Sequence, residues 1–509
     1  MNKKLKGIIS RFFSFIKKRE QIGRDRLNNI DYTNSGMEKS TVNKRTLVVL
    51  VFFIFLFMLL VLYLVYFQLF SSKKVAENDH NKRLWVDENE VLRGSILDRN
   101  GVVLAHTETD SYGNNYRVND YDNLNSSVIG YNSTTYGKSG IEDSYNKDLL
   151  NIPEDTPISQ LKSMVIDSDE GNQVVLTIDN SIQSIINDAL GDKIGAVVVM
   201  RPDNGEVLGM ISKPNFNPNN IDDNWESLIQ DERAPLLNRA TQGVYRPGSI
   251  MKIITATSII DNNIDENYDD TGEEIVDGFK IHNISDQVFG QLDLRNALVH
   301  SSNTYFANKT LKVGKDNLKT TSEKYLFNKE YSFDLIHNTS KIPFDELDKT
   351  DLAMTGFGYG KTETTPLHMA MMVSAIANRG NMMQPRLVKY IVDSETGKIK
   401  KESQNTVLSK VTSTNTALKI TDYMVSVVEN GTGSEAYVPE INIAGKTGTA
   451  ENEDGSNDSW FVGFYPADNP VVSIAIVLEK VDPDSGITAA PIAGQILSSI
   501  YYNVDLSEN

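Results

Sequence analysis

The sequence predicts an α+β protein, and three observations lead to this prediction. An uncharged apolar run near residue 50 predicts an N-terminal transmembrane helix. The polar segment that follows, rich in Asn, Ser, Tyr and Gly, predicts a small, irregular β-rich extracellular module. Strand patterns at both ends of residues 176–505, with helical patterns between them, predict an antiparallel sheet flanked by helices plus an all-helical region.

Composition excludes several classes of protein. The chain has 509 residues, of which 40% are hydrophobic and 23% are charged, so two or three folded units are expected. The lack of cysteine excludes disulfides, thiolate zinc sites and a cysteine nucleophile. Residues 1–45 carry 12 Lys and Arg against 4 Asp and Glu, a net charge of +8; since the whole chain carries −18, the remainder carries −26. An acidic body argues against nucleic acid as its partner.

Residues 47–67 form an unbroken run of 21 uncharged residues, which as a helix spans roughly 31 Å, the thickness of a bilayer's hydrocarbon core. We therefore expect a transmembrane helix over residues 46–70. A buried core helix rarely stays apolar on every face for this length, and a cleaved signal peptide would be shorter and nearer the start. The charge of the arm predicts a single-pass protein of the cell membrane, with residues 1–45 as a cytoplasmic tail and the body outside.

Two details of the N-terminal part complete this prediction. Within the arm, the apolar residues between 8 and 16 recur at helical spacing among lysines, which fits a helix on the inner leaflet as well as a solvated basic tail. Beyond the apolar run, residues 71–175 are expected to form the extracellular module, because the hydrophobic pattern changes near Val174.

The larger domain, over residues 176–505, begins with apolar residues at helical spacing in residues 177–190. Strands are predicted over residues 196–200 and 207–212, joined by a Pro-Asp-Asn-Gly turn that indicates a hairpin. Three more strands are predicted over residues 441–450, 459–465 and 471–479, followed by a helix over residues 490–501. One sheet assembled from these distant halves would enclose the helical middle of the chain.

Ser249 and Lys252 are the first candidates for chemistry. Pro247-Gly248 ends an extended stretch, and the apolar residues after it predict a buried helix that starts near Ser249. A serine at this place is ordinarily an N-cap, but a lysine three residues later shares its helix face and can reach its hydroxyl. Burial among apolar neighbours would depress the pKa of the Lys252 amine toward that of a useful base.

Two later motifs contain further polar side chains. Ser301 and Asn303 lie two apart after His300, where a hydroxyl and a carboxamide can both face a cleft, although such a pair is also common in turns. On a predicted strand, Lys446 supplies positive charge, and Thr447 and Thr449 alternate to one side as hydroxyls suited to a carboxylate. Gly448 is expected to let a substrate backbone approach closely.

The order Ser-x-x-Lys, Ser-x-Asn, Lys-Thr-Gly is the signature of penicillin-binding proteins and class A β-lactamases. The chain resembles class B penicillin-binding proteins more widely, over about residues 90–500. Arg93-Gly-Ser-Ile-Leu-Asp-Arg-Asn-Gly resembles the opening of their extracellular part, and residues 136–142 resemble the compact penicillin-binding protein A subgroup. Further similar stretches are residues 176–179, 195–199, 213–219, 238–240, 431–432 and 460–463.

This resemblance implies a peptidoglycan D,D-transpeptidase with a dimerisation or pedestal-like module and a penicillin-binding transpeptidase domain. Ser249 would attack the D-Ala-D-Ala end of a stem peptide and release D-Ala, with Lys252 as its base and Ser301 as a proton relay. Asn303 would hold the substrate amide, Lys446, Thr447 and Thr449 its carboxylate, and the backbone amides of Ser249 and Thr449 its oxyanion.

The resemblance also implies the partners of the protein. It would act on lipid II-derived strands, bind β-lactam antibiotics covalently and need no cofactor or metal. No glycan-polymerising domain fits between the membrane helix and residue 175, which implies a separate SEDS-type glycosyltransferase. The chain departs from the family pattern in having Gly358-Tyr359-Gly360 where Gly-Gln-Gly is usual, and His368 where Thr-Pro-Leu-Gln is usual.

Rival interpretations have weaker support. A P-loop is excluded because Glu440 and Thr355 stand where the pattern needs glycine, and Ser249 lacks the Gly-x-Ser-x-Gly elbow of α/β-hydrolases. A secreted β-lactamase would be shorter, and an antibiotic sensor would usually have several membrane spans. A non-catalytic scaffold of the wall-building complex is disfavoured by the three intact motifs. The sequence leaves open a role in division, elongation or sporulation, the acceptor amine and the affinity for β-lactams.

Overall fold

The computed structural model describes residue 14 and residues 44–66, 91–152, 170–452, 454–482, 485–486 and 488–506. The chain divides into two compact units, Met1–Asn81 and Lys82–Asn509. Most of the predicted cytoplasmic tail, including the proposed inner-leaflet helix apart from residue 14, lies outside the described residues, as do residues 67–90 and 153–169 of the predicted membrane and extracellular segments.

The first unit contains helix α2, Lys44–Tyr66, which coincides with most of the apolar run. Every side chain from Val48 to Leu64 is at least 42% exposed. No helix among the described residues combines the length and the apolarity that a membrane span requires. The transmembrane helix over residues 46–70 therefore stays a prediction.

A five-stranded antiparallel sheet forms the centre of the second unit, with the strand order β17-β18-β19-β7-β8. It joins the two distant halves of the sequence, as the strand pattern predicted, and β17 is an edge strand. The predicted strand over residues 441–450 begins three residues later, at Ala444. The strands are β7 Gly195–Met200, β8 Val207–Lys213, β17 Ala444–Glu451, β18 Asn457–Tyr465 and β19 Val472–Val481.

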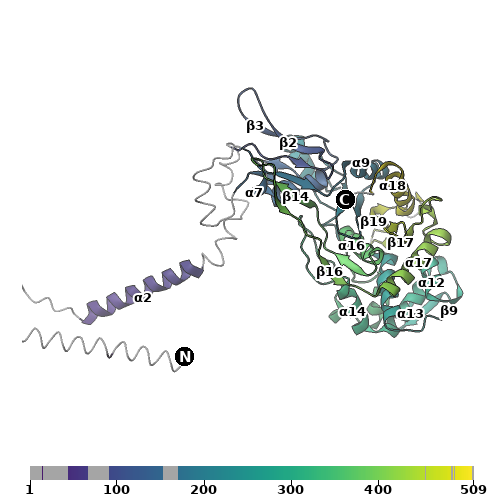
Figure 1. Cartoon of the computed structure of the whole chain (residues 1–509). Helices are drawn as coiled ribbons and strands as arrows, with labels where there is room; N and C mark the ends of the chain where they lie inside the picture. The colour runs from purple at the N-terminus through teal and green to yellow at the C-terminus, as the bar shows by residue number, and fades with distance from the viewer. Residues whose placement is uncertain are drawn as a thin grey trace, which may run out of the picture. The chain divides into compact units, whose positions relative to one another are not determined.

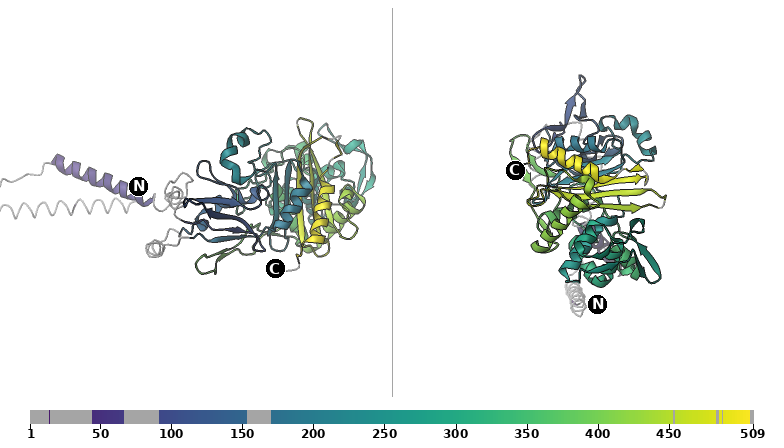
Figure 2. Two further views of the ribbon diagram at one scale, coloured as in Figure 1. Left: turned by 90° about the horizontal axis from the view of Figure 1, so that it is seen from above. Right: turned by 90° about the vertical axis from the view of Figure 1, so that its right-hand side faces the viewer.

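Each face of this sheet packs against its own layer of helices because side chains alternate along a strand. Val197 and Val199 face a core shared with α9, Asn180–Leu190, and α18, Ala489–Asn503. Val198 and Met200 face a larger core that contains α16, Pro366–Ala377. Figures 1 and 2 show α9 and α18 side by side, although they come from opposite ends of the domain.

The predicted helical region lies between β8 and β17 in the sequence and gathers around α13 (Figure 1). The 3₁₀ turn Gly248–Met251 leads directly into α11. The helices of this region are α11 Lys252–Asp261, α12 Leu294–Val299, α13 Asn303–Val313, α14 Lys315–Lys324, α15 Lys349–Thr355 and α17 Thr414–Asn430. Helix α10, Ile221–Gln230, instead packs on the N-terminal module, where Trp225 stacks on Tyr136. Short strand pairs flank the helices of the helical region: β9 Tyr268–Asp270 with β12 Gly290–Leu292, β10 Glu273–Val276 with β11 Phe279–His282, and β13 Asn381–Met383 with β16 Val407–Lys410.

A second, six-stranded sheet contains strands of the N-terminal module, in the order β15-β14-β6-β1-β2-β3. Two of its strands come from far beyond residue 175, and Figure 1 shows β14 among the N-terminal elements. The predicted division at residue 175 therefore passes through a continuous sheet. The strands are β1 Ile96–Leu97, β2 Val103–Thr109, β3 Asn115–Asn119, β6 Gln173–Leu176, β14 Val388–Val392 and β15 Ile399–Glu402.

A buried ion-pair cluster lies beside this sheet. The carboxylate of Glu142 accepts hydrogen bonds from Arg93 Nε at 2.5 Å and from Arg117 Nε at 2.7 Å, and all three side chains are at most 6% exposed. Because buried charges are costly unless paired, this cluster fixes the segment around Arg93 to the module. The module's smaller elements are α5 Ser126–Ile129, β4 Asn132–Ser133, β5 Gly137–Lys138, α6 Gly140–Ser144 and α7 Asn146–Leu149.

Candidate active site

Ser249 lies in the turn Gly248–Met251, which packs against the edge strand β17. Gly248 has φ of +55°, and a Cβ there would come within 2.3 Å of the Thr449 carbonyl oxygen. A residue other than glycine would be strained and obstructed at this point. The indole Nε1 of Trp460 on β18 donates to the Arg246 carbonyl oxygen at 3.1 Å. These contacts place Ser249 where the five-stranded sheet meets the helical region.

Lys252 is the first residue of α11, and its side chain is fully buried. Its Nζ lies 2.9 Å from Ser249 Oγ, 2.6 Å from the Ser301 carbonyl oxygen, 3.1 Å from Ser301 Oγ and 2.8 Å from Asn303 Oδ1. The predicted pairing of Ser249 with Lys252 is therefore present, and the Ser-x-Asn motif converges on the same amine.

The contacts of Lys252 suit a neutral amine. The Ser301 carbonyl and Asn303 Oδ1 can only accept hydrogen bonds, so they occupy the two N–H groups of a neutral amine and leave its lone pair for the Ser249 hydroxyl. Burial lowers the pKa of Lys252 well below its usual value, and the neighbouring charge of Lys446 lowers it further. The site can thus hold a base next to a serine hydroxyl at neutral pH.

Ser301 connects the two lysines. Its Oγ lies 3.1 Å from the Nζ of Lys252 and 3.0 Å from the Nζ of Lys446. Its φ of +57° is uncommon for a residue with a Cβ, and it turns the carbonyl as well as the hydroxyl toward Lys252. Burial lowers the pKa of Lys446 to about 7. A hydroxyl between two amines of depressed pKa can pass a proton in either direction.

Strand β17 places Lys446 and the two threonines differently. Lys446 is fully buried, whereas Thr447 is partly exposed and Thr449 is exposed. The Thr447 hydroxyl donates to Thr432 Oγ1 at 2.8 Å. A Cβ on Gly448 would lie 2.9 Å from the Pro247 carbonyl oxygen, so this glycine lets β17 approach the serine turn of the chain itself. The sequence pattern had suggested approach by a substrate backbone.

The two departures from the family pattern, at Tyr359 and His368, differ in their distance from the serine turn. The hydroxyl of Tyr359 is 3.4 Å from the Thr449 carbonyl oxygen, and Gly358 packs against Gly248, so the Gly-Tyr-Gly segment borders the serine turn. Burial raises the pKa of Tyr359. His368 is instead fully buried on α16, where its Nε2 lies 2.6 Å from the Tyr325 carbonyl oxygen.

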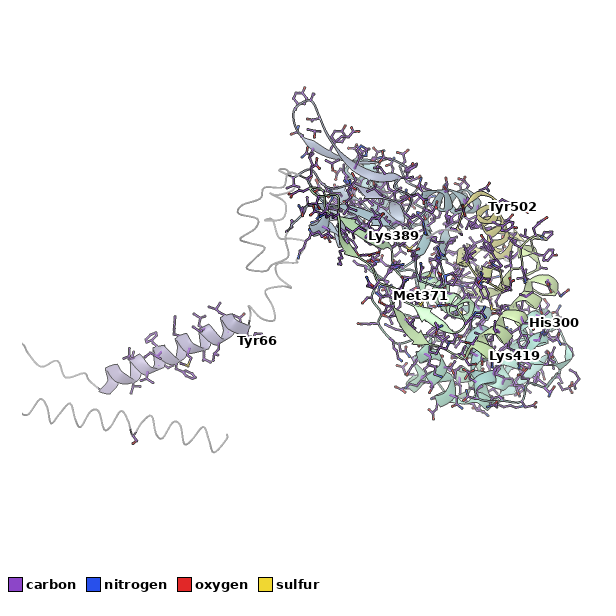
Figure 3. All side chains as sticks on the ribbon, in the orientation of Figure 1. Tyr66, His300, Met371, Lys389, Lys419 and Tyr502 are labelled. Atoms are coloured by element: carbon purple, nitrogen blue, oxygen red, sulfur yellow. The ribbon has the colours of Figure 1, made fainter. Side chains whose placement is uncertain are left out.

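His300, which precedes Ser301, does not join the lysine cluster in the described contacts. Its ring stacks on Phe289 with the ring centroids 4.8 Å apart, and it is exposed at the margin of the helical region (Figure 3). Asp270 and Asn283 contact the Ser-x-Asn segment from behind, and no motif in the sequence pointed to them. Their only sequence signal is that they are isolated polar residues next to short strand patterns.

Fold and site together define a serine acyl-transfer enzyme with a lysine in contact with the nucleophile. A family model described as the penicillin binding protein transpeptidase domain matches residues 195–498, and one described as the penicillin binding protein A dimerisation domain matches residues 93–174. The chain belongs to the penicillin-binding protein transpeptidase family.

Relatives with assigned names agree with this family. Penicillin-binding protein 3 of Bacillus subtilis is 32% identical over 62% of this chain, which spans about half of that protein's length, 49%. The peptidoglycan D,D-transpeptidase PbpA of Mycolicibacterium smegmatis is 27% identical over 84% of this chain and 92% of that protein.

Solved structures show the same fold. A D,D-transpeptidase domain of a peptidoglycan glycosyltransferase from Eggerthella lenta has a TM-score of 0.74 and 33% identity, over 82% of this chain and 99% of that one. Penicillin-binding protein A of Mycobacterium tuberculosis, solved as a ceftriaxone acyl-enzyme complex, has a TM-score of 0.76 and 26% identity, over 81% of this chain and 99% of that one.

Proposed function

We propose that the protein is a peptidoglycan D,D-transpeptidase that cross-links stem peptides through an acyl-enzyme on Ser249. The observation that carries the proposal is the 2.9 Å contact between Ser249 Oγ and the fully buried amine of Lys252. Membership of the transpeptidase family and the acyl-enzyme complexes of its structural relatives support the same chemistry.

Acylation begins when Ser249 Oγ attacks the carbonyl carbon of the penultimate D-Ala and Lys252 accepts the hydroxyl proton. The peptide C–N bond breaks, the leaving D-Ala takes up a proton through Ser301, and an ester to Ser249 remains. An amine from a neighbouring strand then attacks the ester and gives up a proton to Lys252. The ester C–O bond breaks, Ser249 Oγ takes up that proton, and the new amide bond completes the cross-link. β-Lactams would form a similar ester.

The remaining site residues hold the substrate in this proposal. Protonated Lys446, with Thr447 and Thr449, pairs with the terminal carboxylate, and Asn303 binds the substrate amide. The backbone amides of Ser249 and Thr449 stabilise the oxyanion, which contributes about 3–4 kcal/mol per donor. The close approach of Gly248 to Thr449 supports this last assignment, since it brings the two amide-bearing segments together.

We propose further that α2 anchors the protein in the bacterial cell membrane, with residues 1–45 in the cytoplasm and the catalytic domain outside. The exposed apolar side chains of Val48–Leu64 and the positive charge of the arm support this location. Protease added to intact cells stripped of their wall should digest the catalytic domain and leave the N-terminal tail. Digestion of the tail alone would contradict the orientation.

A separate SEDS-type glycosyltransferase is the proposed partner, because the proposed cross-linking activity acts on glycan strands that a polymerase supplies. The test of function uses the full-length protein in detergent with such a polymerase and lipid II. Cross-linked product and free D-Ala are expected, and neither with Ser249→Ala. Release of D-Ala without cross-links would indicate a carboxypeptidase, and opening of β-lactams with rapid turnover would indicate a β-lactamase.

A further inference from the structure

Two buried polar residues behind the active site, Asp270 and Asn283, touch none of the proposed catalytic side chains. Asp270 ends β9 and is 1% exposed, and Asn283 follows β11 and is 4% exposed. We propose that these two residues form a positioning pair that holds the Ser-x-Asn segment against Lys252. The inference rests on the proposed function, since it concerns acylation of Ser249.

Asp270 accepts hydrogen bonds at both carboxylate oxygens. Its Oδ1 accepts from the Gly272 amide at 2.7 Å and from the Thr304 hydroxyl at 3.1 Å. Its Oδ2 accepts from the Ser302 hydroxyl at 3.2 Å and from Asn283 Nδ2 at 2.9 Å. A carboxylate can accept a hydrogen bond at every one of these contacts. A carboxamide has only one oxygen, so its NH₂ group would face another donor.

Asn283 connects Asp270 to the start of α13 through hydrogen bonds. While its Nδ2 donates to Asp270, its Oδ1 accepts from the backbone amides of Asn303 at 2.8 Å and Thr304 at 3.2 Å. The Ser302 hydroxyl accepts from the Tyr305 amide at 3.1 Å. The first three amides of the helix, which have no partner within it, are therefore all held by buried side chains.

The start of α13 in turn sets the surroundings of Lys252. Asn303 Oδ1 accepts from Lys252 Nζ at 2.8 Å, and Asn303 Nδ2 donates to the His282 carbonyl oxygen at 3.1 Å. His282 and Asn283 are adjacent, so a single turn holds both the backbone and the side chain of Asn303. Ser301, which contacts both lysines, lies two residues before Asn303. A displacement of this segment would move two partners of the base at once.

Replacing Asp270 by asparagine keeps its shape but points the carboxamide donor either at the Gly272 amide or at Asn283 Nδ2, both of which can only donate. We expect Asp270→Asn to slow acylation by penicillin about 10–100-fold, as displaced catalytic geometry does. The acid limb of the rate profile should move to lower pH. The reason is that Asn303 Oδ1 can accept from either form of the Lys252 amine but stabilises the charged form more. Losing this acceptor therefore lowers the pKa of Lys252 further, and Lys446 is the other cation beside it.

The exchanged double variant Asp270→Asn/Asn283→Asp puts the carboxylate on the other partner, where it accepts from the Asn303 and Thr304 amides and from the new carboxamide. Acylation should recover to within about threefold of wild type, whereas Asn283→Asp alone, with two facing carboxylates, should be slow. The matched control is Asp179→Asn, which changes a buried carboxylate at the start of another 11-residue helix, α9. Its acylation rate should stay at the wild-type value.

All variants are tested as the full-length protein in detergent, by the rate of labelling with fluorescent penicillin at several concentrations and pH values. A wild-type rate in Asp270→Asn would overturn the inference. So would a slowed Asp270→Asn with an unmoved acid limb and no recovery in the double variant, which would indicate general loss of structure. A wild-type protein that never labels would instead contradict the proposed function.

Discussion

The amine of Lys252 is fully buried and contacts oxygen atoms of Ser249, Ser301 and Asn303. A second lysine, Lys309 on α13, is equally buried, but its Nζ donates to backbone carbonyl oxygens of the loop that follows α11, including that of Asn267 at 2.7 Å. Two lysines with the same burial thus have different surroundings, and only one of them adjoins a serine hydroxyl.

This pair gives a matched test of the base. Lys252→Met should lower the rate of penicillin acylation by at least about 100-fold, because it removes the group that accepts the Ser249 proton. Lys309→Met removes a buried lysine of the same size and should leave the rate per folded molecule unchanged. Labelling rates compared with the melting temperature of each variant decide the matter. Equal loss of rate in both variants would mean that burial, and not base chemistry, explains the effect.

Lys446 predicts how ligand binding depends on pH. Burial lowers its pKa to about 7, so above that pH the free site must take up a proton before it pairs with a carboxylate. The non-covalent dissociation constant of penicillin, measured in Ser249→Ala, should rise by up to about tenfold per pH unit above neutrality. The double variant Ser249→Ala/Lys446→Met should bind penicillin weakly at every pH. A dissociation constant of Ser249→Ala that does not change with pH would refute the assignment of Lys446 as the partner of the carboxylate.

At the scale of elements, α16 carries a buried histidine at a position where the family usually has glutamine. His368 Nε2 donates to the Tyr325 carbonyl, and its Nδ1 has no hydrogen-bond partner among the described residues. Burial lowers the pKa of His368 to about 4, and the charge of His337 acts in the same direction. The neutral ring fits this place and the protonated ring does not.

The lowered pKa of His368 determines how the stability of the protein changes with pH. Between pH 6.5 and 4 the unfolded chain binds a proton that the folded chain does not, so the free energy of unfolding should fall by up to about 3 kcal/mol across this window. His368→Gln keeps a donor for Tyr325 and cannot titrate. Denaturant unfolding at pH 7 and pH 4.5 should show a smaller difference for the variant; an equal difference would place the acid sensitivity elsewhere.

Sequence patterns predicted the elements that consist of alternating or periodic residues. Residues 196–200 are a short, continuous apolar run before a turn, because both faces of β7 are buried, and this made the strand recognisable. Ser249, Lys252 and Lys446 were found through their motifs. The partners of these residues were not. β14 pairs with β6 across more than 200 residues, and the positive φ of Ser301 and the contacts of Asn283 with α13 depend on tertiary packing that no local pattern records.

At the scale of the whole second unit, the chain itself joins the two sheets, since β14 and β15, which lie between α16 and α17 in the sequence, complete the N-terminal sheet. The buried ion-pair cluster around Glu142 lies beside the N-terminal sheet. Burial alone would raise the pKa of Glu142, but Arg117 and Arg93 together hold it below its usual value. Its contribution to stability is therefore present above the carboxyl's unfolded pKa and is lost as the pH falls through the lowered one.

Glu142→Gln leaves two buried arginines without their carboxylate and should lower the free energy of unfolding by about 3–5 kcal/mol at neutral pH. Because the sheet is continuous with the larger domain, the catalytic domain should melt at the same lowered temperature as the module. Labelling by penicillin well below that temperature should be unchanged. Separate melting of the module, with the catalytic domain unaffected, would show that the two sheets unfold independently.

The central claim is that Ser249 forms the acyl-enzyme, and the mass of the intact protein after reaction with penicillin G tests it most directly. We expect one added penicillin per folded chain, located by peptide mapping to the segment that contains Ser249, and no addition to Ser249→Ala. An adduct that persists in Ser249→Ala, or a folded wild-type protein that never gains mass, would contradict the account.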